Sequence, residues 1–574
     1  MKFPSSPSAL PNQLPHLLHN LPTTLYHQSC FIAHYLRISK SVPHLKQTHA
    51  LLLKLSTDSP NYHLLLARLL SHLLLLPGGD TLRYALNLFD EIPNCRNQFI
   101  WTSLIRYNVV LDKFKESFVL YAEMQREGIP PSGFTFSSVL NACARMPAVF
   151  QGRQINAKIV RTGFMGNKVV QTALLDMYAK CGFVGDARDV FDRMVDRDVI
   201  AWTAMISGYT KRCMMEDARR LFNNMGQRNV ISWTTMVAGY ANCGDMEAAK
   251  ELYDKMEEKN LITWVAMVAG YGKCGNVREA RRVFDEIPNQ DASSWAAMVA
   301  CYAQNGYAKE AINMYKKMRE QNVTIDEVAM VGAISACTQL GDAEMAATLV
   351  NHVDQGCCCR SLFVSNALIH LHSKCGNLEE AVKEFNRMNE KDVVSYTALI
   401  TALGDHGKAK RALQLFSKMQ KDGITPNQVT FIGVLNACSF AGLVEDGCRY
   451  FELMTRVYRI KPLNEHYACI IDLLGRAGLL GKAYTFIKKN GNVADAKIWS
   501  SLLASCKVHG NEELAKIAAM HLFEIEPENT GTYVLLASIY AAMNKWDDAE
   551  RVRTMMTEKG IRKSPGRSWI SLMR

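Results

Sequence analysis

The stretch from Val230 to Asn260 reads VISWTTMVAGYANCGDMEAAKELYDKMEEKN, and its pattern decides the fold. Apolar side chains in its first half stand at i, i+3, i+4 and i+7, the spacing of one face of an α-helix. Gly244 and Asp245 then interrupt the helix, because glycine accepts a positive φ angle and aspartate favours the start of a new helix. A second apolar stripe follows, so the stretch predicts two antiparallel helices joined by a short turn.

The same turn recurs along the chain at intervals of 31 to 36 residues. Its glycines are Gly244, Gly275, Gly306, Gly341, Gly376, Gly407, Gly442, Gly478 and Gly510. A period of this length predicts an all-α solenoid, in which each unit buries its apolar face only against its neighbours. Three further slots repeat in step: an aromatic residue in the first helix, and an alanine and a late methionine in the second. We expect all three slots to be core.

The 574 residues carry a net charge of +11, and 48% of them are hydrophobic. The positive charge suits a polyanionic partner such as RNA, although many proteins without such a partner are equally basic. Many of the 17 cysteines fall at repeat positions, in "NAC", "SAC" and "KCG", which favours small apolar packing in a reducing compartment over disulfides. The run Cys357–Cys359 is poorly spaced for one tetrahedral metal ion, so we expect free thiols there.

The first 57 residues contain no Asp or Glu, but they contain several Lys, Ser and Thr. Such a start is typical of an organellar transit peptide, which we place, with a disordered N-terminus, at residues 1–41. The other interpretation is a frayed terminus that lacks acids by chance. The leucine-rich segment Leu64–Leu76 is short and interrupted by Arg68 and His72, which predicts a buried helix and no membrane span.

Three stretches carry a resemblance to a known family. They are VVQTALLDMYAKCGFVGDARDVFDRMVDRD (Val169 to Asp198), FTFSSVLNACARMPAVFQGRQINAKIVRTGF (Phe134 to Phe164) and VVSYTALITALGDHGKAKRALQLFSKMQKDGITPN (Val393 to Asn427). They resemble the short, long and standard units of the plant pentatricopeptide repeat (PPR) family, and the mixture of unit lengths resembles its PLS subclass. The resemblance implies a right-handed α-solenoid superhelix of helix-turn-helix repeats.

The resemblance also implies unit boundaries. Degenerate repeats are expected at 42–97, and an E-type extension with tetratricopeptide-like (TPR-like) helix pairs is expected at 496–574. Between them lie the expected PPR units 98–132, 133–167, 168–198, 199–229, 230–260, 261–291, 292–326, 327–361, 362–392, 393–427, 428–463 and 464–495. The chain stops soon after "PGRSWI" (Pro565 to Ile570), without the DYW-type cytidine deaminase domain that some members of the family carry.

No catalytic motif stands out in the sequence. A zinc deaminase needs H-x-E for one zinc ligand and the proton-shuttling glutamate, and P-C-x-x-C for two thiolate ligands. None of the 15 histidines is followed by x-Glu, and there is no C-x-x-C. We therefore expect a protein that is not an enzyme and that holds no cofactor or metal.

PPR units read single-stranded RNA one base per repeat, and in the family the fifth and last residues of a unit form the reading pair. Thr, Asn, Asp and Ser have suitable sizes and hydrogen-bonding groups for base edges. The pairs carried over, with their implied bases, are Thr172 with Asp198 for G, Thr203 with Asn229 for A, Thr234 with Asn260 for A, Asn366 with Asp392 for U, and Thr397 with Asn427 for A. Three further pairs are weaker. Thr102 with Ser132 implies only a purine. In the other two, Val265 with Asp291 and Ala296 with Asp326, the fifth residue is apolar.

Helix-start chemistry offers another interpretation of these residues, because Thr, Asn and Asp near helix ends are often caps. For a single residue the two interpretations are equally good, but the in-register set favours base contact. The excess of Lys and Arg would supply attraction to phosphates. The resemblance then implies a target similar to 5′-GAAnnnUAnnnnnC, in which the final C is edited to U.

The favoured function is sequence-specific recognition of sites for C-to-U editing in organellar transcripts. The expected partners are single-stranded organellar RNA and a DYW-type cytidine deaminase or other editing factor, recruited in trans through the region from Ala496 onward. One alternative is an organellar RNA splicing, processing or stability factor, and a second is a TPR-like protein–protein scaffold. Family habit favours the mitochondrion over the chloroplast.

Overall fold

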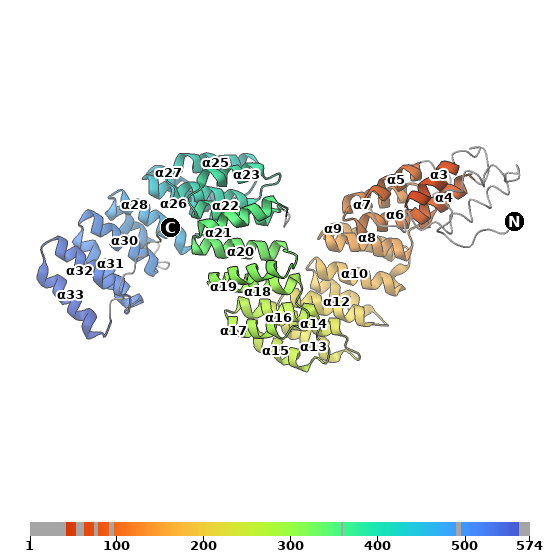
Figure 1. Cartoon of the computed structure of the whole chain (residues 1–574), viewed down its shortest axis with the longest axis horizontal. Helices are drawn as coiled ribbons and strands as arrows, with labels where there is room; N and C mark the ends of the chain where they lie inside the picture. Colours follow the sequence, from red (N-terminus) through yellow and green to blue (C-terminus); the bar gives the residue numbers. More distant parts are fainter. Residues whose placement is uncertain are drawn as a thin grey trace. The chain divides into compact units, whose positions relative to one another are not determined.

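A computed structural model describes residues 42–52, 62–73, 79–90, 97–356, 360–489 and 495–561. Every regular element in these ranges is helical, which confirms the expected all-α fold (Figure 1). The first compact unit, Met1–Gly270, contains the following helices. They are α3 (Val42–Leu52), α4 (Tyr62–Leu73), α5 (Gly79–Asp90), α6 (Gln98–Val110), α7 (Phe114–Arg126), α8 (Gly133–Arg145), α9 (Val149–Arg161), the short η3 (Phe164–Gly166), α10 (Lys168–Lys180), α11 (Val184–Arg193), α12 (Val199–Lys211), α13 (Met215–Asn224), α14 (Val230–Cys243) and α15 (Met246–Lys255).

Helix α16 (Leu261–Lys273) crosses the boundary to the second compact unit, Tyr271–Arg574. That unit continues with α17 (Val277–Asp285), α18 (Ala292–Gln304), α19 (Ala308–Glu320), α20 (Glu327–Leu340), α21 (Ala343–Asp354), α22 (Leu362–Lys374), α23 (Leu378–Arg387), α24 (Val393–Asp405), α25 (Ala409–Lys421), α26 (Gln428–Ala441), α27 (Val444–Glu452), the π-helical η4 (Leu453–Val457), α28 (Asn464–Arg476), α29 (Leu480–Lys489), α30 (Ala496–His509), α31 (Glu512–Ile525), α32 (Thr530–Ala542) and α33 (Trp546–Glu558). From α6 to α30, each first helix begins at the first residue of its expected unit.

The turn between paired helices forms as the glycine spacing predicts. Gly244 ends α14 with a φ angle of +86°, a conformation that glycine adopts without steric cost. Asp245 follows, and its side chain accepts a hydrogen bond from the backbone N–H of Ala248 at 3.0 Å, which caps α15. Within each compact unit, first helices also pack on the first helix of the next pair, as α8 does on α10 and α24 on α26.

Where the first helix carries an aromatic residue in its fourth position, the ring can pack on the second helix of the preceding pair. Trp202 meets Phe191 edge to face with ring centroids 4.9 Å apart, and Tyr396 meets Phe385 at 5.0 Å. This geometry places the positive ring edge against the negative ring face. The alanine and methionine slots are buried, as expected, at Ala187, Ala218, Ala249, Ala280, Ala311, Ala346, Ala381, Ala412, Ala483, Ala515, Ala549, Met194, Met225, Met256, Met318, Met388, Met419 and Met454.

The cysteines divide into two groups. Cys143, Cys337 and Cys438 are buried free thiols, and burial raises the pKa of each to about 12. These thiols stay protonated at neutral pH and pack as small apolar groups. Cys274 is exposed, so the packing prediction is wrong for the "KCG" cysteine of that unit. Its turn lies at the surface, beyond the contact between the two helices.

Two details adjust the simple pattern. In the 36-residue unit 428–463, the second helix ends in the π-helical turn η4, a geometry that takes up an additional residue without unfolding the helix.

Helix α4 is buried along Leu65, Leu66, Leu69, Leu70 and Leu73. In the described ranges, no helix is long and apolar enough to cross a membrane. The expected transit peptide, the Cys357–Cys359 run and "PGRSWI" lie outside the described residues.

Cys213 occupies the turn position that glycine holds at Gly182 and Gly244. Its φ angle is +56°, where a side chain with a Cβ atom costs roughly 1–2 kcal/mol. We expect Cys213→Gly to raise the free energy of unfolding by about 0.5–1 kcal/mol, because the relief of strain exceeds the added entropy of the unfolded chain. Urea melts of the full chain would measure the change. The reverse substitution, Gly244→Cys, should destabilise by a similar amount, and a destabilised Cys213→Gly variant would contradict the argument.

Candidate nucleic-acid interface

The last residue of each expected reading unit caps the first helix of the next unit. Asn229, for example, accepts the backbone N–H of Ser232 through Oδ1 at 2.9 Å. Asp198 accepts the N–H of Ala201 in the same way at 2.8 Å. The full set of such caps among the expected readers is Ser132, Asp198, Asn229, Asn260, Asp291, Asp326, Asp392 and Asn427. The capping interpretation therefore holds for every one of them.

Capping uses only one of the two polar atoms of each Asn and Asp side chain. In Asn260 and Asn427 the Oδ1 atom accepts both the N–H and the hydroxyl of the third residue of the following helix, Thr263 or Thr430, at 2.8–2.9 Å. The Nδ2 groups of Asn229, Asn260 and Asn427 have no hydrogen-bond partner within the part of the chain that the structure describes. Because an amide has an acceptor at one end and two donors at the other, each asparagine keeps its donors available.

The fifth residues lie beside these caps in four of the expected pairs. Thr234 Oγ1 is 3.3 Å from Asn260 Oδ1, and Asn366 Nδ2 is 3.4 Å from Asp392 Oδ1. In the other two pairs, a third-residue hydroxyl bridges the partners. Thr135 contacts Thr102 at 2.7 Å and Ser132 at 2.9 Å, and Thr430 contacts Thr397 at 2.7 Å and Asn427 at 2.9 Å.

The remaining pairs are less connected. Thr172 and Thr203 donate to the carbonyl oxygens four residues earlier, at 3.0 and 2.6 Å. The structure places no hydrogen bond between Thr172 and Asp198 or between Thr203 and Asn229. For Asp291 and Asp326, the fifth residues Val265 and Ala296 offer no polar group.

Asn366 and Asp392 form the most polar pair. Asn366 is 8% exposed, and its Oδ1 atom is buried without a hydrogen-bond partner among the described residues. Burial pushes the pKa of Asp392 upward, but hydrogen bonds from Ser395 and Asn366 outweigh burial and hold the pKa below its ordinary value. Asp392 is therefore an ionised acceptor at neutral pH, next to a second acceptor that lacks a donor.

Two open grooves contain expected pairs. The first groove, of about 760 Å³, is lined by Thr102 and Ser132 together with Phe99, Phe134 and Arg106. The second, of about 570 Å³, is lined by Thr234 and Asn260 together with Ile231, Ile262 and Lys211. Each groove lies between consecutive first helices, so each combines a reading pair, apolar side chains and one cation.

The apolar side chains that flank the grooves belong to a row that the sequence analysis missed. The second residue of most first helices is a large hydrophobic residue that is about half to three-quarters exposed. The row comprises Phe99, Phe134, Val169, Ile200, Ile231, Ile262, Val328, Phe363, Val394 and Val429. The sequence contains a signal for it, because these residues stand beside the cap and off the apolar stripe of their helix.

Sequence reasoning also missed three caps and the buried third-residue hydroxyls. Asn167, Ser361 and Asp495 cap α10, α22 and α30, as the expected readers cap their helices. The fully buried hydroxyls are Thr135, Ser232, Thr263, Ser294, Ser395 and Thr430. Their signal is the spacing of a cap residue followed three positions later by Ser or Thr, as in a capping box.

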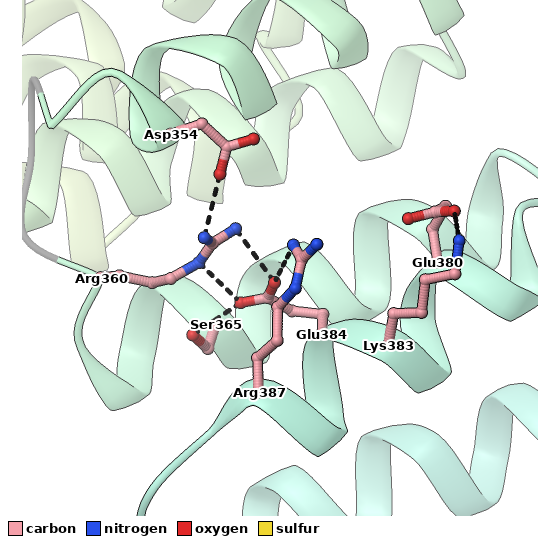
Figure 2. A network of polar contacts seen from close by, with 7 residues as sticks. All are labelled: Asp354, Arg360, Ser365, Glu380, Lys383, Glu384 and Arg387. Carbon is pink, nitrogen blue, oxygen red and sulfur yellow. Dashed lines mark hydrogen bonds and ion pairs between the residues drawn. The ribbon is translucent and has the colours of Figure 1, made fainter.

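A buried ionic network supports the helix that carries Asn366. Figure 2 shows Glu384 of α23 held between Arg360, Arg387 and Ser365. The Glu384 side chain is 3% exposed and lies 3.0 Å from Arg360, which also reaches Asp354 at 2.9 Å. Ser365 donates to Glu384 at 2.9 Å from the slot where most other first helices carry an aromatic residue. At this junction an ion pair therefore replaces a ring contact. The Lys383–Glu380 pair in the same view is a separate exposed contact.

Models of known families match most of the repeat region. A model described as "PPR repeat family" matches residues 96–145 and 391–440. A model described as "PPR repeat" matches residues 172–199, 200–230, 231–261, 262–290, 293–323 and 363–393. A third, described as "E motif", matches residues 509–571.

Similar proteins include several from Arabidopsis thaliana. The putative pentatricopeptide repeat-containing protein At5g37570 is 50% identical over 93% of this chain and 97% of its own length. The mitochondrial At2g03880 and the chloroplastic CRR2 are each 35% identical to this chain over 86% of its length. The matched region spans 62% of At2g03880 and 61% of CRR2. Among solved structures, PPR10 from maize is 16% identical with a TM-score of 0.49, covering 96% of this chain and 90% of that one.

Proposed function

The chain belongs to the pentatricopeptide repeat family, and on this premise we propose that it binds single-stranded RNA by sequence and selects sites for C-to-U editing in organellar transcripts. PPR repeats read one base per repeat through two or three side chains. The single observation that carries the proposal is that the Asn and Asp residues at the last position cap a helix through Oδ1 and leave the second polar atom of the side chain outside the cap. In Asp198 that second atom, Oδ2, lies 3.6 Å from Lys168 Nζ.

The available end explains which bases the pairs accept. An asparagine whose Oδ1 is used by the cap presents Nδ2 donors, which suit the acceptor N1 of adenine. An aspartate whose Oδ1 is used presents Oδ2, an acceptor, which suits the N–H donor of guanine N1 or uracil N3. Asn229, Asn260 and Asn427 would thus favour adenine, and Asp198 and Asp392 would favour guanine and uracil. The unpartnered Oδ1 of Asn366 adds a second acceptor beside Asp392.

The remaining groove residues supply affinity. Apolar residues such as Ile231 and Ile262 flank the Thr234–Asn260 groove, where a base can lie between them and exchange water for van der Waals contact. Lys211 in this groove and Arg106 in the other supply positive charge for phosphates. Because apolar contact and charge are insensitive to base identity, discrimination between bases depends on the reading pairs.

The C-terminal region is the part of the chain that would recruit the deaminase. The E-motif match at residues 509–571 supports editing over other RNA processing, since the resemblance associates this extension with editing factors. A separate DYW-type deaminase would supply the zinc and the catalytic water. An organelle is the proposed location, with the mitochondrion preferred and the chloroplast as the alternative, and relatives carry both names.

RNA binding by this code is tested by gel shift with an oligonucleotide of sequence 5′-GAAnnnUAnnnnnC. We expect the RNA with altered GAA and UA letters to bind at least tenfold more weakly, because five base contacts would be lost or mismatched. The double variant Thr234→Ala, Asn366→Ala should lose a similar factor on the original RNA. Equal affinity for both RNAs would overturn the base assignments, and no RNA binding would favour a protein scaffold.

The editing role needs a separate experiment. Sequencing of organellar transcripts from a plant that lacks this protein should show at least one cytidine that stays unedited while splicing is normal. The nucleotides upstream of that cytidine should match the proposed letters. Defective splicing with complete editing would instead identify a processing factor.

A further inference from the structure

A tyrosine fills one buried position in successive repeats. The eleventh residue of four consecutive first helices, α10, α12, α14 and α16, is a tyrosine that is 3–8% exposed: Tyr178, Tyr209, Tyr240 and Tyr271. Its hydroxyl reaches toward the second helix of the preceding pair, where Tyr178 accepts a hydrogen bond from Asn156 at 3.1 Å. Tyr209 and Tyr240 interact there with Arg188 and Arg219, which occupy one repeat position.

Helix α6 lacks both partners of this contact. Its eleventh residue is Asn108, and Leu86 of α5 stands where Arg188 and Arg219 stand, one residue after the small alanine of its helix. The phenol ring and the cation that faces it are thus both replaced at this junction. An asparagine is too short to fill the volume of a tyrosine side chain.

A cavity of about 350 Å³ occupies this place. Its walls are Leu86, Asn108, Lys115, Glu116, Val119 and Leu120. Glu116 lies at the same repeat position as Asp186, whose charge acts on Tyr178, so the cavity coincides with the tyrosine slot. The volume falls within the range of small-ligand pockets.

Asn108 lines the cavity and carries an unused acceptor. The residue is 1% exposed, and its Nδ2 group donates to the carbonyl oxygen of Leu104 at 2.9 Å. That bond fixes the orientation of the amide. Its Oδ1 atom is buried and makes no hydrogen bond to any described residue, which costs free energy that a donor would recover.

We propose that this cavity binds a phenol ring that enters from the surface and donates its hydroxyl hydrogen to Asn108 Oδ1. The ring would occupy the volume that tyrosine fills in the neighbouring repeats, between the apolar Leu86, Val119 and Leu120. The exposed Lys115 and Glu116 form the rim, where the rest of the ligand would lie. The phenol could come from a free phenolic compound or from a tyrosine of another polypeptide.

The site is separate from the RNA grooves. None of its lining residues lines the groove of Thr102 and Ser132, although both involve α6. The cavity is built on the second helices α5 and α7, whereas the grooves lie between first helices. The proposal therefore does not depend on the reading pairs or on RNA binding.

The test is calorimetric titration of the full-length protein with 4-methylphenol, the side-chain analogue of tyrosine. We expect one binding site on the wild type and at least a tenfold loss of affinity in Asn108→Tyr, which fills the cavity from within. Toluene has nearly the same shape but no hydroxyl, so it should bind several-fold more weakly than 4-methylphenol. Asn108→Leu keeps the side-chain volume but removes the acceptor, and should abolish that difference between the probes.

Thermal melts and circular dichroism of each variant would show that it is folded. If Asn108→Tyr alone is poorly folded, the double variant Leu86→Arg, Asn108→Tyr rebuilds the contact of the other repeats and serves instead. Titration with N-acetyl-tyrosine amide distinguishes the sources, since binding as tight as that of 4-methylphenol indicates a polypeptide and weaker binding a free phenolic compound. Absence of binding to the wild type, or equal binding to Asn108→Tyr, would overturn the proposal.

Discussion

Replacing Asn229 and Asn260 by aspartate is expected to change the preferred RNA from GAA to GGG at the first three proposed letters. Affinity for the original RNA should fall by about 100-fold, from a loss of about 1.4 kcal/mol at each of two positions. Affinity for the GGG sequence should rise by a similar factor. Fluorescence anisotropy with both oligonucleotides at one salt concentration would measure the exchange.

The physical reason is that asparagine and aspartate share one end and differ at the other. Both side chains present Oδ1 to the helix, so the hydrogen bonds to the N–H groups of Ser232 and Thr263 survive the change. The free end changes from a donor to an acceptor, which adenine N1 repels and guanine N1–H matches. The free energy of unfolding should therefore change by less than about 0.5 kcal/mol.

Asn276 offers a matched control for this pair of substitutions. It caps the second helix α17 through Oδ1, at 3.3 Å from the N–H of Glu279, and is not one of the reading residues. Asn276→Asp should leave the base preference unchanged. Asn260→Ala should both weaken RNA binding and destabilise the chain by about 1 kcal/mol, because it removes cap and reader together. An unchanged preference for GAA in the double aspartate variant would refute the code assignment.

Replacing Arg360 by methionine is expected to destabilise the second compact unit by about 3 kcal/mol. The substitution leaves the Glu384 carboxylate, which is 3% exposed, without its principal partner. Removal of one member of a buried ion pair costs about 3–5 kcal/mol, and the partial exposure of Arg360 places the expected value at the lower end. Urea melts and hydrogen exchange of α22 and α23 would measure the loss.

The same pair allows a compensating change. In Arg360→Met, Glu384→Gln the buried charge is gone, and a glutamine can still accept the hydroxyl of Ser365, so most of the lost stability should return. Because Ser365 precedes Asn366, the single variant should also weaken discrimination for uracil, and the double variant should restore it.

Arg411 provides the matched surface control. It pairs with Glu379 at 3.1 Å, and both side chains are largely exposed. Arg411→Met should therefore cost less than about 1 kcal/mol. If Arg360→Met were no more harmful than Arg411→Met, the buried network would not stabilise this junction.

Much of the fold follows from periodicity. The glycine spacing places turns where Gly244 and its equivalents take positive φ angles, and the apolar stripes place the helices. Both signals are local, because they depend on the conformation of one residue and on the 3.6-residue period of one helix. The start of each first helix is equally local, since the cap residue and the hydroxyl three positions later identify it.

Contacts between repeats are less visible in the sequence. The exchange of an aromatic contact for the Arg360–Glu384 pair depends on residues 24 positions apart, and no short pattern links them. The Asn108 cavity depends on two replacements on different helices, each unremarkable alone. For the proposed reading residues, sequence reasoning treated capping and base contact as alternatives. In the structure the cap of each asparagine uses only Oδ1, so the proposed base contact would use the other end of the same side chain.

Under the proposed code, one residue serves as both cap and reader, which has a consequence for how such a protein changes over generations. Codons for asparagine and aspartate differ only in their first nucleotide, so one transition converts one residue into the other. Because either residue starts the helix equally well, a lineage can revise one letter of its target in a single mutational step while the chain still folds. The need to start a helix thus restricts these positions to a few short polar residues. Substitutions among those residues preserve the fold and therefore remain available to selection.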